Sequence, residues 1–180
     1  MKNEIILVTG GARSGKSRFA ESLLKPVGAK YYLATCPVPD AEMAERVKRH
    51  QAARAAQRWI TIEEPLDLFS AVRRARDAGA EGLLIDCLTL WINNLLYEAE
   101  QQKQDLTEEK MERSTRAVLT ELAAFPGRAV LVISEVGLGI VPESPLARRF
   151  RDLSGRCAQC VAAQASQVYF CVAGIAQRIK

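Results

Sequence analysis

Residues 10–17 read GGARSGKS and match the pattern G-x-x-x-x-G-K-S, a phosphate-binding loop that opens a helix. Such a loop needs glycine because its backbone must turn successive N–H groups inward, toward phosphate oxygens. In this pattern the Lys16 ammonium reaches the β- and γ-phosphates of a nucleotide, and the Ser17 hydroxyl reaches Mg²⁺. The loop therefore requires a strand before it and a helix after it.

The flanking residues meet that requirement. Residues 5–8 (IILV) are a short apolar run, typical of a buried parallel strand. Residues 17–24 predict a helix with Phe19, Leu23 and Leu24 toward the sheet. Because pattern and context agree, we interpret residues 10–17 as a nucleotide site rather than a chance glycine-rich turn.

Strands and helices alternate along the rest of the chain. We expect strands at 31–35, 59–62, 82–86, 128–133, 168–172 and 175–179, and helices at 41–57, 66–78, 88–100, 107–124 and 145–165. This order predicts a three-layer α/β fold: a mostly parallel sheet with helices on both faces, and phosphates at the carboxyl ends of the strands. No linker or repeat interrupts it, so residues 1–180 are expected to form a single nucleotide-binding domain.

Composition further narrows the class of protein that the sequence can encode. Apolar residues make up 48% and charged residues 26% of the chain, which is ordinary for a globular protein. The net charge of +4 is mild and no basic tail is present, so we expect no nucleic-acid partner. No apolar run is long enough for a membrane span, and no signal peptide is evident. Five scattered cysteines are typical of free thiols in a reducing compartment, which indicates a cytoplasmic protein.

Two acidic residues end apolar strands. Asp86 follows the run 83–85, as a Walker-B carboxylate that holds Mg²⁺ does, although such an acid can also cap the next helix near Thr89. Glu135 closes the strand at 128–133 in the same way. It could bind Mg²⁺, orient a nucleophile, act as a base, or be a plain loop acid.

His50 is the only histidine and falls in the predicted helix 41–57, which is rich in charge, with Arg46, Lys48, Arg49 and Arg54 nearby in the sequence. A lone histidine there is usually a solvated surface residue. The same basic neighbours would also favour neutral imidazole, which is a nucleophile at phosphorus, and would attract a triphosphate. The residues alone leave both interpretations open.

Two further clusters lie in the predicted helix 145–165. Cys157 and Cys160 have no second cysteine or histidine pair nearby, so we interpret them as small residues one turn apart rather than a zinc site. The cluster of Arg148, Arg149 and Arg151 could contact phosphate, a subunit interface or water.

Five stretches together resemble the bifunctional family of adenosylcobinamide kinase/adenosylcobinamide-phosphate guanylyltransferase. They are ILVTGGARSGKSRFAE at 6–21, YLATC at 32–36, DAEMAERVKRHQ at 40–51, LLIDCLTLWINNLL at 83–96 and ISEVGLGIVPESPLARRFRDLSGRCAQ at 133–159. The resemblance runs from residue 6 nearly to the end of the chain. It implies a P-loop NTPase fold of the RecA-like type, assembled as a homotrimer.

The resemblance also implies two reactions. A nucleoside triphosphate, ATP or GTP, phosphorylates the aminopropanol hydroxyl of adenosylcobinamide. GTP then transfers GMP to that phosphate through a GMP–histidine intermediate, and only His50 fits the place of this histidine. Lys16 is the second expected catalytic residue. A kinase with a single activity, and a regulatory nucleotide switch, remain as alternatives.

Nucleotide contacts carry over by the same resemblance. They fall on the phosphate loop, the end of the second strand, the residues after His50, and two acids: Gly10, Gly11, Ala12, Arg13, Ser14, Gly15, Lys16, Ser17, Ala34, Thr35, Cys36, Gln51, Ala52, Ala53, Arg54, Glu63 and Asp86. Mg²⁺ is expected on Ser17 and Asp86, directly or through water. The chain departs from the family at Arg49, where a second histidine is frequent, and at residues 51–53.

Overall fold

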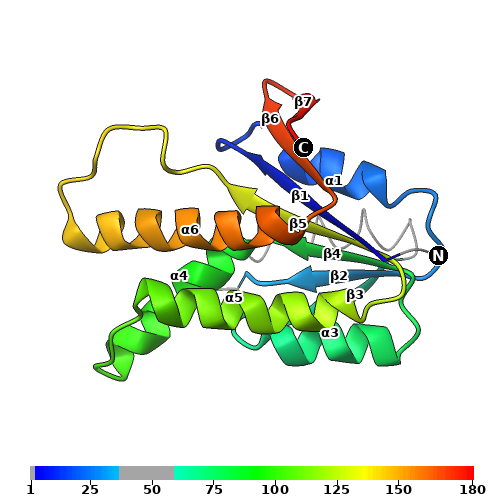
Figure 1. Cartoon of the computed structure of the whole chain (residues 1–180), viewed down its shortest axis with the longest axis horizontal. Helices are drawn as coiled ribbons and strands as arrows, with labels where there is room; N and C mark the ends of the chain where they lie inside the picture. The colour runs from blue at the N-terminus through cyan, green and yellow to red at the C-terminus, as the bar shows by residue number, and fades with distance from the viewer. Residues whose placement is uncertain (1–2, 37–58) are drawn as a thin grey trace, which may run out of the picture.

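The computed structural model describes residues 3–36 and 59–180, and it has one seven-stranded sheet in the order β3-β2-β4-β5-β1-β6-β7 (Figure 1). All neighbouring strands are parallel except β6 and β7, which form an antiparallel hairpin. The strands are β1 (Glu4–Gly10), β2 (Lys30–Ala34), β3 (Trp59–Glu63), β4 (Gly82–Asp86), β5 (Arg128–Ser134), β6 (Gln167–Val172) and β7 (Ile175–Arg178). The helices are α1 (Lys16–Leu23), α3 (Leu68–Asp77), α4 (Leu88–Gln101), α5 (Glu108–Ala123) and α6 (Pro145–Gln164).

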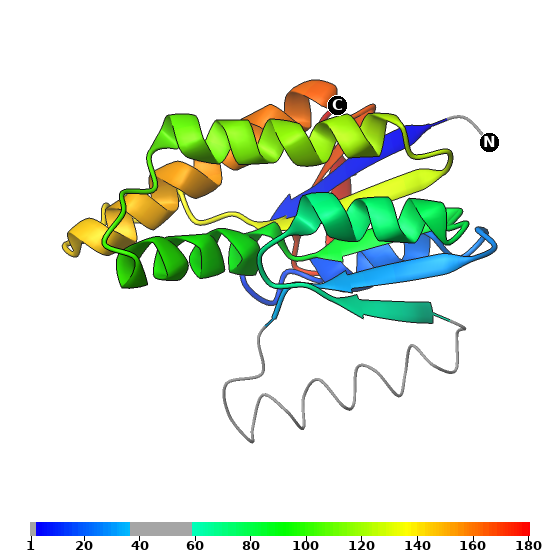
Figure 2. The same ribbon diagram turned by 90° about the horizontal axis from the view of Figure 1, so that it is seen from below.

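The central strands bury both of their faces, which is why they are continuous apolar runs in the sequence. Ile5, Leu7 and Leu131 belong to the core under α3, α4, α5 and α6. Ile6 and Val132 alternate with these residues and belong to a second core on the other face. That core includes Ala20 of α1 and Leu24, which directly follows α1. The two cores lie on opposite faces of the sheet, so the expected three-layer arrangement is confirmed. Figure 2 shows α5 and α6 stacked on one side of the strands, with α1 partly hidden behind them.

Polar side chains fix where three helices begin. The Asp67 carboxylate accepts from the Ser70 N–H, so α3 begins at Leu68, two residues later than the sequence predicts. Thr107 and Ser144 cap α5 and α6 in the same manner. In the first turn of α3, Leu68 is buried and Phe69 is exposed.

The five cysteines are all free thiols. Cys157 and Cys160 lie one turn apart on α6 and are buried, and burial raises the pKa of Cys157 to about 12. Both are therefore small neutral core residues, as the sequence predicts. None of the helices in residues 3–36 and 59–180 is long and apolar enough to cross a lipid bilayer.

Candidate functional site

The carboxyl edge of the sheet brings the expected site residues of four strands together. Ala34 at the end of β2 is in register with Glu63 of β3 on one side and with Asp86 of β4 on the other. Gly10 at the end of β1 is in register with Ser134 of β5. Since β5 lies between β1 and β4, the phosphate loop and Asp86 flank the same strand end.

The loop itself has the backbone that the sequence predicts for binding phosphate. Arg13 and Gly15 have positive φ angles of 57° and 91°, and α1 begins directly afterwards at Lys16. The N–H groups of a first helical turn have no partner within the helix, so they are available to an anion. The Lys16 Nζ donates to the Gly11 carbonyl at 3.0 Å, which holds the ammonium group over the loop.

The β6–β7 hairpin packs against the phosphate loop, a contact that sequence reasoning missed. The β6–β7 turn donates the Gly174 N–H to the Ser14 carbonyl at 3.0 Å. A Cβ on Gly10 would lie 2.3 Å from the Cys171 carbonyl oxygen of β6. The Ser14 hydroxyl is buried there without a hydrogen-bond partner among the described residues. The turn residues 173–174 give a hairpin signal in the sequence, but nothing in that signal says what the hairpin contacts.

Gly10→Ala is expected to disturb the loop, because backbone carbonyl atoms cannot move aside as a flexible side chain can. We expect the free energy of unfolding to fall by about 1–3 kcal/mol and the Kd for GTP to rise about tenfold or more. Thermal melts and calorimetric titration measure the two effects. Gly155→Ala on α6 is the matched control, because a Cβ there meets nothing within 4 Å. Equal GTP affinity in the two variants would contradict the close packing at Gly10.

Asp86 is oriented by Tyr32 of β2, whose hydroxyl donates to the Asp86 Oδ2 at 3.1 Å. Cys87, not Asp86, is the N-cap residue of α4, and this cap has no side-chain hydrogen bond. The alternative role of Asp86 as a helix cap is therefore not supported. Burial, and then the neighbouring Asp86 charge, raise the pKa of the Cys87 thiol, which stays neutral. The arrangement leaves an oriented, half-buried carboxylate at the carboxyl edge of the sheet.

A buried polar network fixes the end of β2 against α4. The Thr35 hydroxyl donates to the Cys87 carbonyl at 2.8 Å and accepts from the Cys87 N–H at 2.9 Å. Asn94 of α4 donates to the carbonyls of Thr35 and Pro65. The Thr35 hydroxyl therefore bonds within the protein, and these hydrogen bonds fix its position near Asp86. Sequence reasoning did not single out Tyr32 or Asn94, because their partners are 29 to 59 residues away.

Tyr32→Phe removes the hydroxyl that orients Asp86. We expect about a tenfold loss of activity at limiting Mg²⁺, with about 1 kcal/mol lost from the free energy of unfolding. Tyr31→Phe is the control, since the Tyr31 hydroxyl donates to Ala78, away from this edge. A magnesium titration of the reaction rate distinguishes the variants, and identical titration curves would rule out the orienting role.

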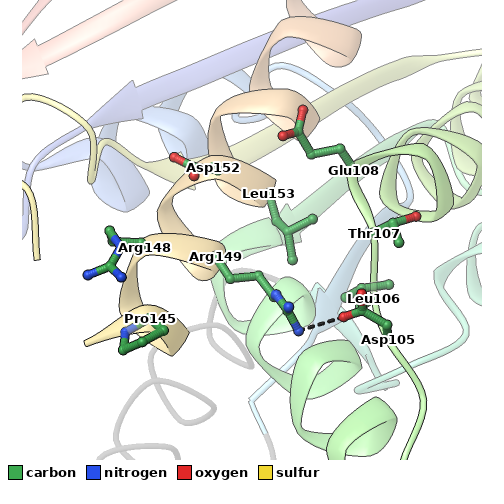
Figure 3. Close-up of a pocket in the computed structure, with 9 residues that line it drawn as sticks. All are labelled: Asp105, Leu106, Thr107, Glu108, Pro145, Arg148, Arg149, Asp152 and Leu153. Atoms are coloured by element: carbon green, nitrogen blue, oxygen red, sulfur yellow. Dashed lines mark ion pairs between the residues drawn. The ribbon is translucent and has the colours of Figure 1, made fainter. Parts of the chain in front are cut away.

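The other acid and the arginine cluster have internal partners. The Glu135 Oε1 accepts from the Leu138 N–H at 3.1 Å and from the Gly137 N–H, which supports the loop-acid interpretation. Arg151 pairs with Asp152, and Arg149 pairs with Asp105 across a surface pocket of about 300 Å³ (Figure 3). This pocket is formed by residues 105–108 and the first turns of α6, and contains no residue of the phosphate loop.

Five of the expected site residues lie outside the described part of the chain. They are His50, Gln51, Ala52, Ala53 and Arg54. Within the described part, no group of three or more histidine, cysteine or acidic side chains could hold a metal alone. The Ser17 hydroxyl and the Asp86 carboxylate are oxygen donors, which suit Mg²⁺ when a nucleotide's phosphates complete its coordination.

Comparison with known proteins shows which family the chain resembles over nearly its whole length. Residues 6–179 match the family described as "Cobinamide kinase / cobinamide phosphate guanyltransferase". The bifunctional adenosylcobalamin biosynthesis protein CobP of Pseudomonas aeruginosa is 44% identical over 175 residues, covering 97% of this chain and 96% of that protein. The bifunctional adenosylcobalamin biosynthesis protein CobU of Escherichia coli is 40% identical over 182 residues, covering 98% and 99%.

Among solved structures, the KaiC-like protein PH0186 of Pyrococcus horikoshii OT3 shares the fold. The TM-score is 0.51 at 13% identity, and the match covers 94% of this chain and 71% of that one. At this identity the likeness concerns the fold alone. Together with the strand order, it confirms the expected RecA-like P-loop NTPase fold.

Proposed function

Because this chain belongs to the cobinamide kinase / cobinamide phosphate guanyltransferase family, we infer that it carries out both reactions in cobalamin biosynthesis. The observation that supports this most directly is the phosphate loop at residues 10–17, with Lys16 held over it and Asp86 two strands away. The loop accounts for triphosphate binding, which both reactions need.

The first reaction is a phosphoryl transfer to the aminopropanol hydroxyl of adenosylcobinamide. The hydroxyl oxygen bonds to the γ-phosphorus, the bond from that phosphorus to the bridging oxygen breaks, and the nucleoside diphosphate leaves. The hydroxyl proton passes to solvent. The N–H groups of the loop and Lys16 neutralise the phosphate oxygens and hold the nucleotide in line. ATP and GTP both fit this role, because the loop contacts phosphates rather than the base.

The second reaction transfers GMP in two steps, with His50 as the nucleophile. An imidazole nitrogen of His50 bonds to the α-phosphorus of GTP, and pyrophosphate leaves. A phosphate oxygen of adenosylcobinamide phosphate then attacks the same phosphorus, which releases His50 and gives adenosylcobinamide-GDP. The covalent intermediate divides one difficult displacement into two. Residues 51–54, the strand ends at 34–36, and Glu63 are proposed to contact the nucleotide during these steps.

The two reactions need different phosphorus atoms in line with an acceptor, the γ in one and the α in the other. One fixed arrangement cannot present both to one acceptor. We therefore propose that the segment around His50 moves, or that the nucleotide rebinds, between the reactions. Mg²⁺, held by Ser17 and Asp86, would supply charge neutralisation at the phosphates. A homotrimer is part of this proposal, by the family resemblance.

A product assay tests the proposed function. The purified protein is incubated with adenosylcobinamide, GTP and Mg²⁺, and corrinoids are separated by chromatography while pyrophosphate is measured. We expect adenosylcobinamide phosphate first, and then adenosylcobinamide-GDP with one pyrophosphate per GMP transferred. Phosphorylated corrinoid without pyrophosphate would instead favour the alternative, a kinase with a single activity.

A further inference from the structure

The loop that follows β5 exposes apolar side chains in an unusual concentration. Residues 136–142, VGLGIVP, carry no charge. Leu138 is 81% exposed, Ile140 96% and Val141 61%. Single exposed apolar residues are common on proteins, but a cluster of them marks a surface that another molecule covers.

Polar contacts hold this loop at both ends. At its start, the Glu135 carboxylate accepts from the N–H groups of Gly137 and Leu138. At its end, the Arg148 Nη1 donates to the carbonyls of Pro142 and Glu143 at 2.9 and 2.6 Å. The backbone is therefore anchored without burying the apolar side chains, which remain available for binding.

The loop also leaves the sheet between the two parts of the nucleotide site. Strand β5 has β1 on one side and β4 on the other, and these strands end at Gly10 and Asp86. The Glu135 N–H donates to the Gly10 carbonyl at 3.0 Å, so the loop begins one hydrogen bond from the phosphate loop. Figure 1 shows it extending outward from this edge of the sheet to the start of α6.

The surface continues beyond the loop into α6. Leu146 is 44% exposed, and together with Tyr97 and Phe150 it lines a hollow of about 320 Å³ between α4 and α6. Glu100 also lines this hollow, whereas residues 136–142 and Leu146 carry no charge. An uncharged, apolar surface does not suit a polyanionic nucleotide. It does suit the substrate's other part, a corrin ring, which is a large macrocycle with apolar faces and uncharged amide side chains.

We propose that residues 136–142, together with Leu146, form the surface on which the corrin ring of adenosylcobinamide rests. This inference rests on the proposed function, and it adds the corrinoid contacts that the sequence patterns do not locate. From that surface the flexible aminopropanol arm extends back along the start of the loop, toward the carboxyl end of β5 and the terminal phosphate of the nucleotide. Residues 136–142 would thereby hold the aminopropanol hydroxyl near the phosphate loop.

The experiment compares the wild-type protein with the double variant L138S/I140S. Equilibrium dialysis measures the Kd for adenosylcobinamide, calorimetry the Kd for GTP, and size-exclusion chromatography the assembly. We expect the corrinoid Kd to rise about tenfold or more, because two large apolar contacts are lost, with GTP affinity and assembly unchanged. Ile179→Ser is the matched control, a 61% exposed isoleucine beside the edge strand β7, and it should leave all three values unchanged.

Four results would overturn the inference, the proposed function, or both. An unchanged corrinoid Kd in the double variant would overturn the inference. A smaller assembly with unchanged corrinoid affinity would also do so, and would assign the loop to an interface between copies of the chain. A wild-type protein that binds adenosylcobinamide but phosphorylates none would refute the proposed function and leave the surface intact. A wild-type protein that binds no corrinoid would refute both.

Discussion

His50→Ala is expected to abolish guanylyl transfer while leaving the kinase reaction within a few-fold of wild type. The imidazole is the proposed acceptor of GMP, and removing a catalytic nucleophile lowers the rate by at least about 10⁴-fold. The proposed kinase reaction does not use His50, so adenosylcobinamide phosphate should accumulate. Chromatography of the corrinoids after incubation with GTP measures both activities in one sample.

His50→Gln keeps a polar side chain of similar size and provides the matched variant. It should lose guanylyl transfer as fully as His50→Ala, because an amide nitrogen is not a nucleophile at neutral pH. If either variant still forms adenosylcobinamide-GDP at more than a small fraction of the wild-type rate, His50 is not the nucleophile. If both reactions fall together, the residue instead serves nucleotide binding or folding.

Lys16→Ala is expected to lower kcat/KM of both reactions by about 10²–10³-fold. The Lys16 ammonium lies over the loop, bonded to the Gly11 carbonyl, where it can neutralise the charge on a triphosphate. Both reactions use a triphosphate, so a loss confined to one of them would contradict a shared phosphate site. Lys25→Ala, which removes an exposed lysine just after α1, is the control for the change in net charge. Steady-state rates with GTP, measured separately for each reaction, provide the comparison.

The part of the fold that the sequence predicts well is the part that depends on local patterns. The apolar run before Gly10, the glycines of the loop, and the alternation of strands and helices follow from short-range chemistry, and the sheet confirms them. Asp86 is placed at a strand end for the same reason. The strand order could not be read from the residues, because it depends on which crossover packs on which face.

The features that the sequence did not predict are contacts between distant segments. Tyr32 reaches Asp86 from 54 residues away, and the β6–β7 turn reaches Ser14 from the far end of the chain. A tyrosine in a strand, or an Ala-Gly turn, carries no local signal of such a partner. The loop at 136–142 contributed to the family resemblance, but its exposure and its two anchors are visible only in the fold.

The proposed transfer of the guanylyl group of GTP to His50 is tested most directly by peptide mass spectrometry. The protein is incubated with GTP and Mg²⁺ without corrinoid, kept at neutral pH to preserve the acid-labile phosphoramidate, and digested. We predict that the peptide containing residue 50 gains the mass of one guanylyl group, and that adding adenosylcobinamide phosphate removes it. A peptide that never gains this mass, or a guanylyl group on another residue, would contradict the account.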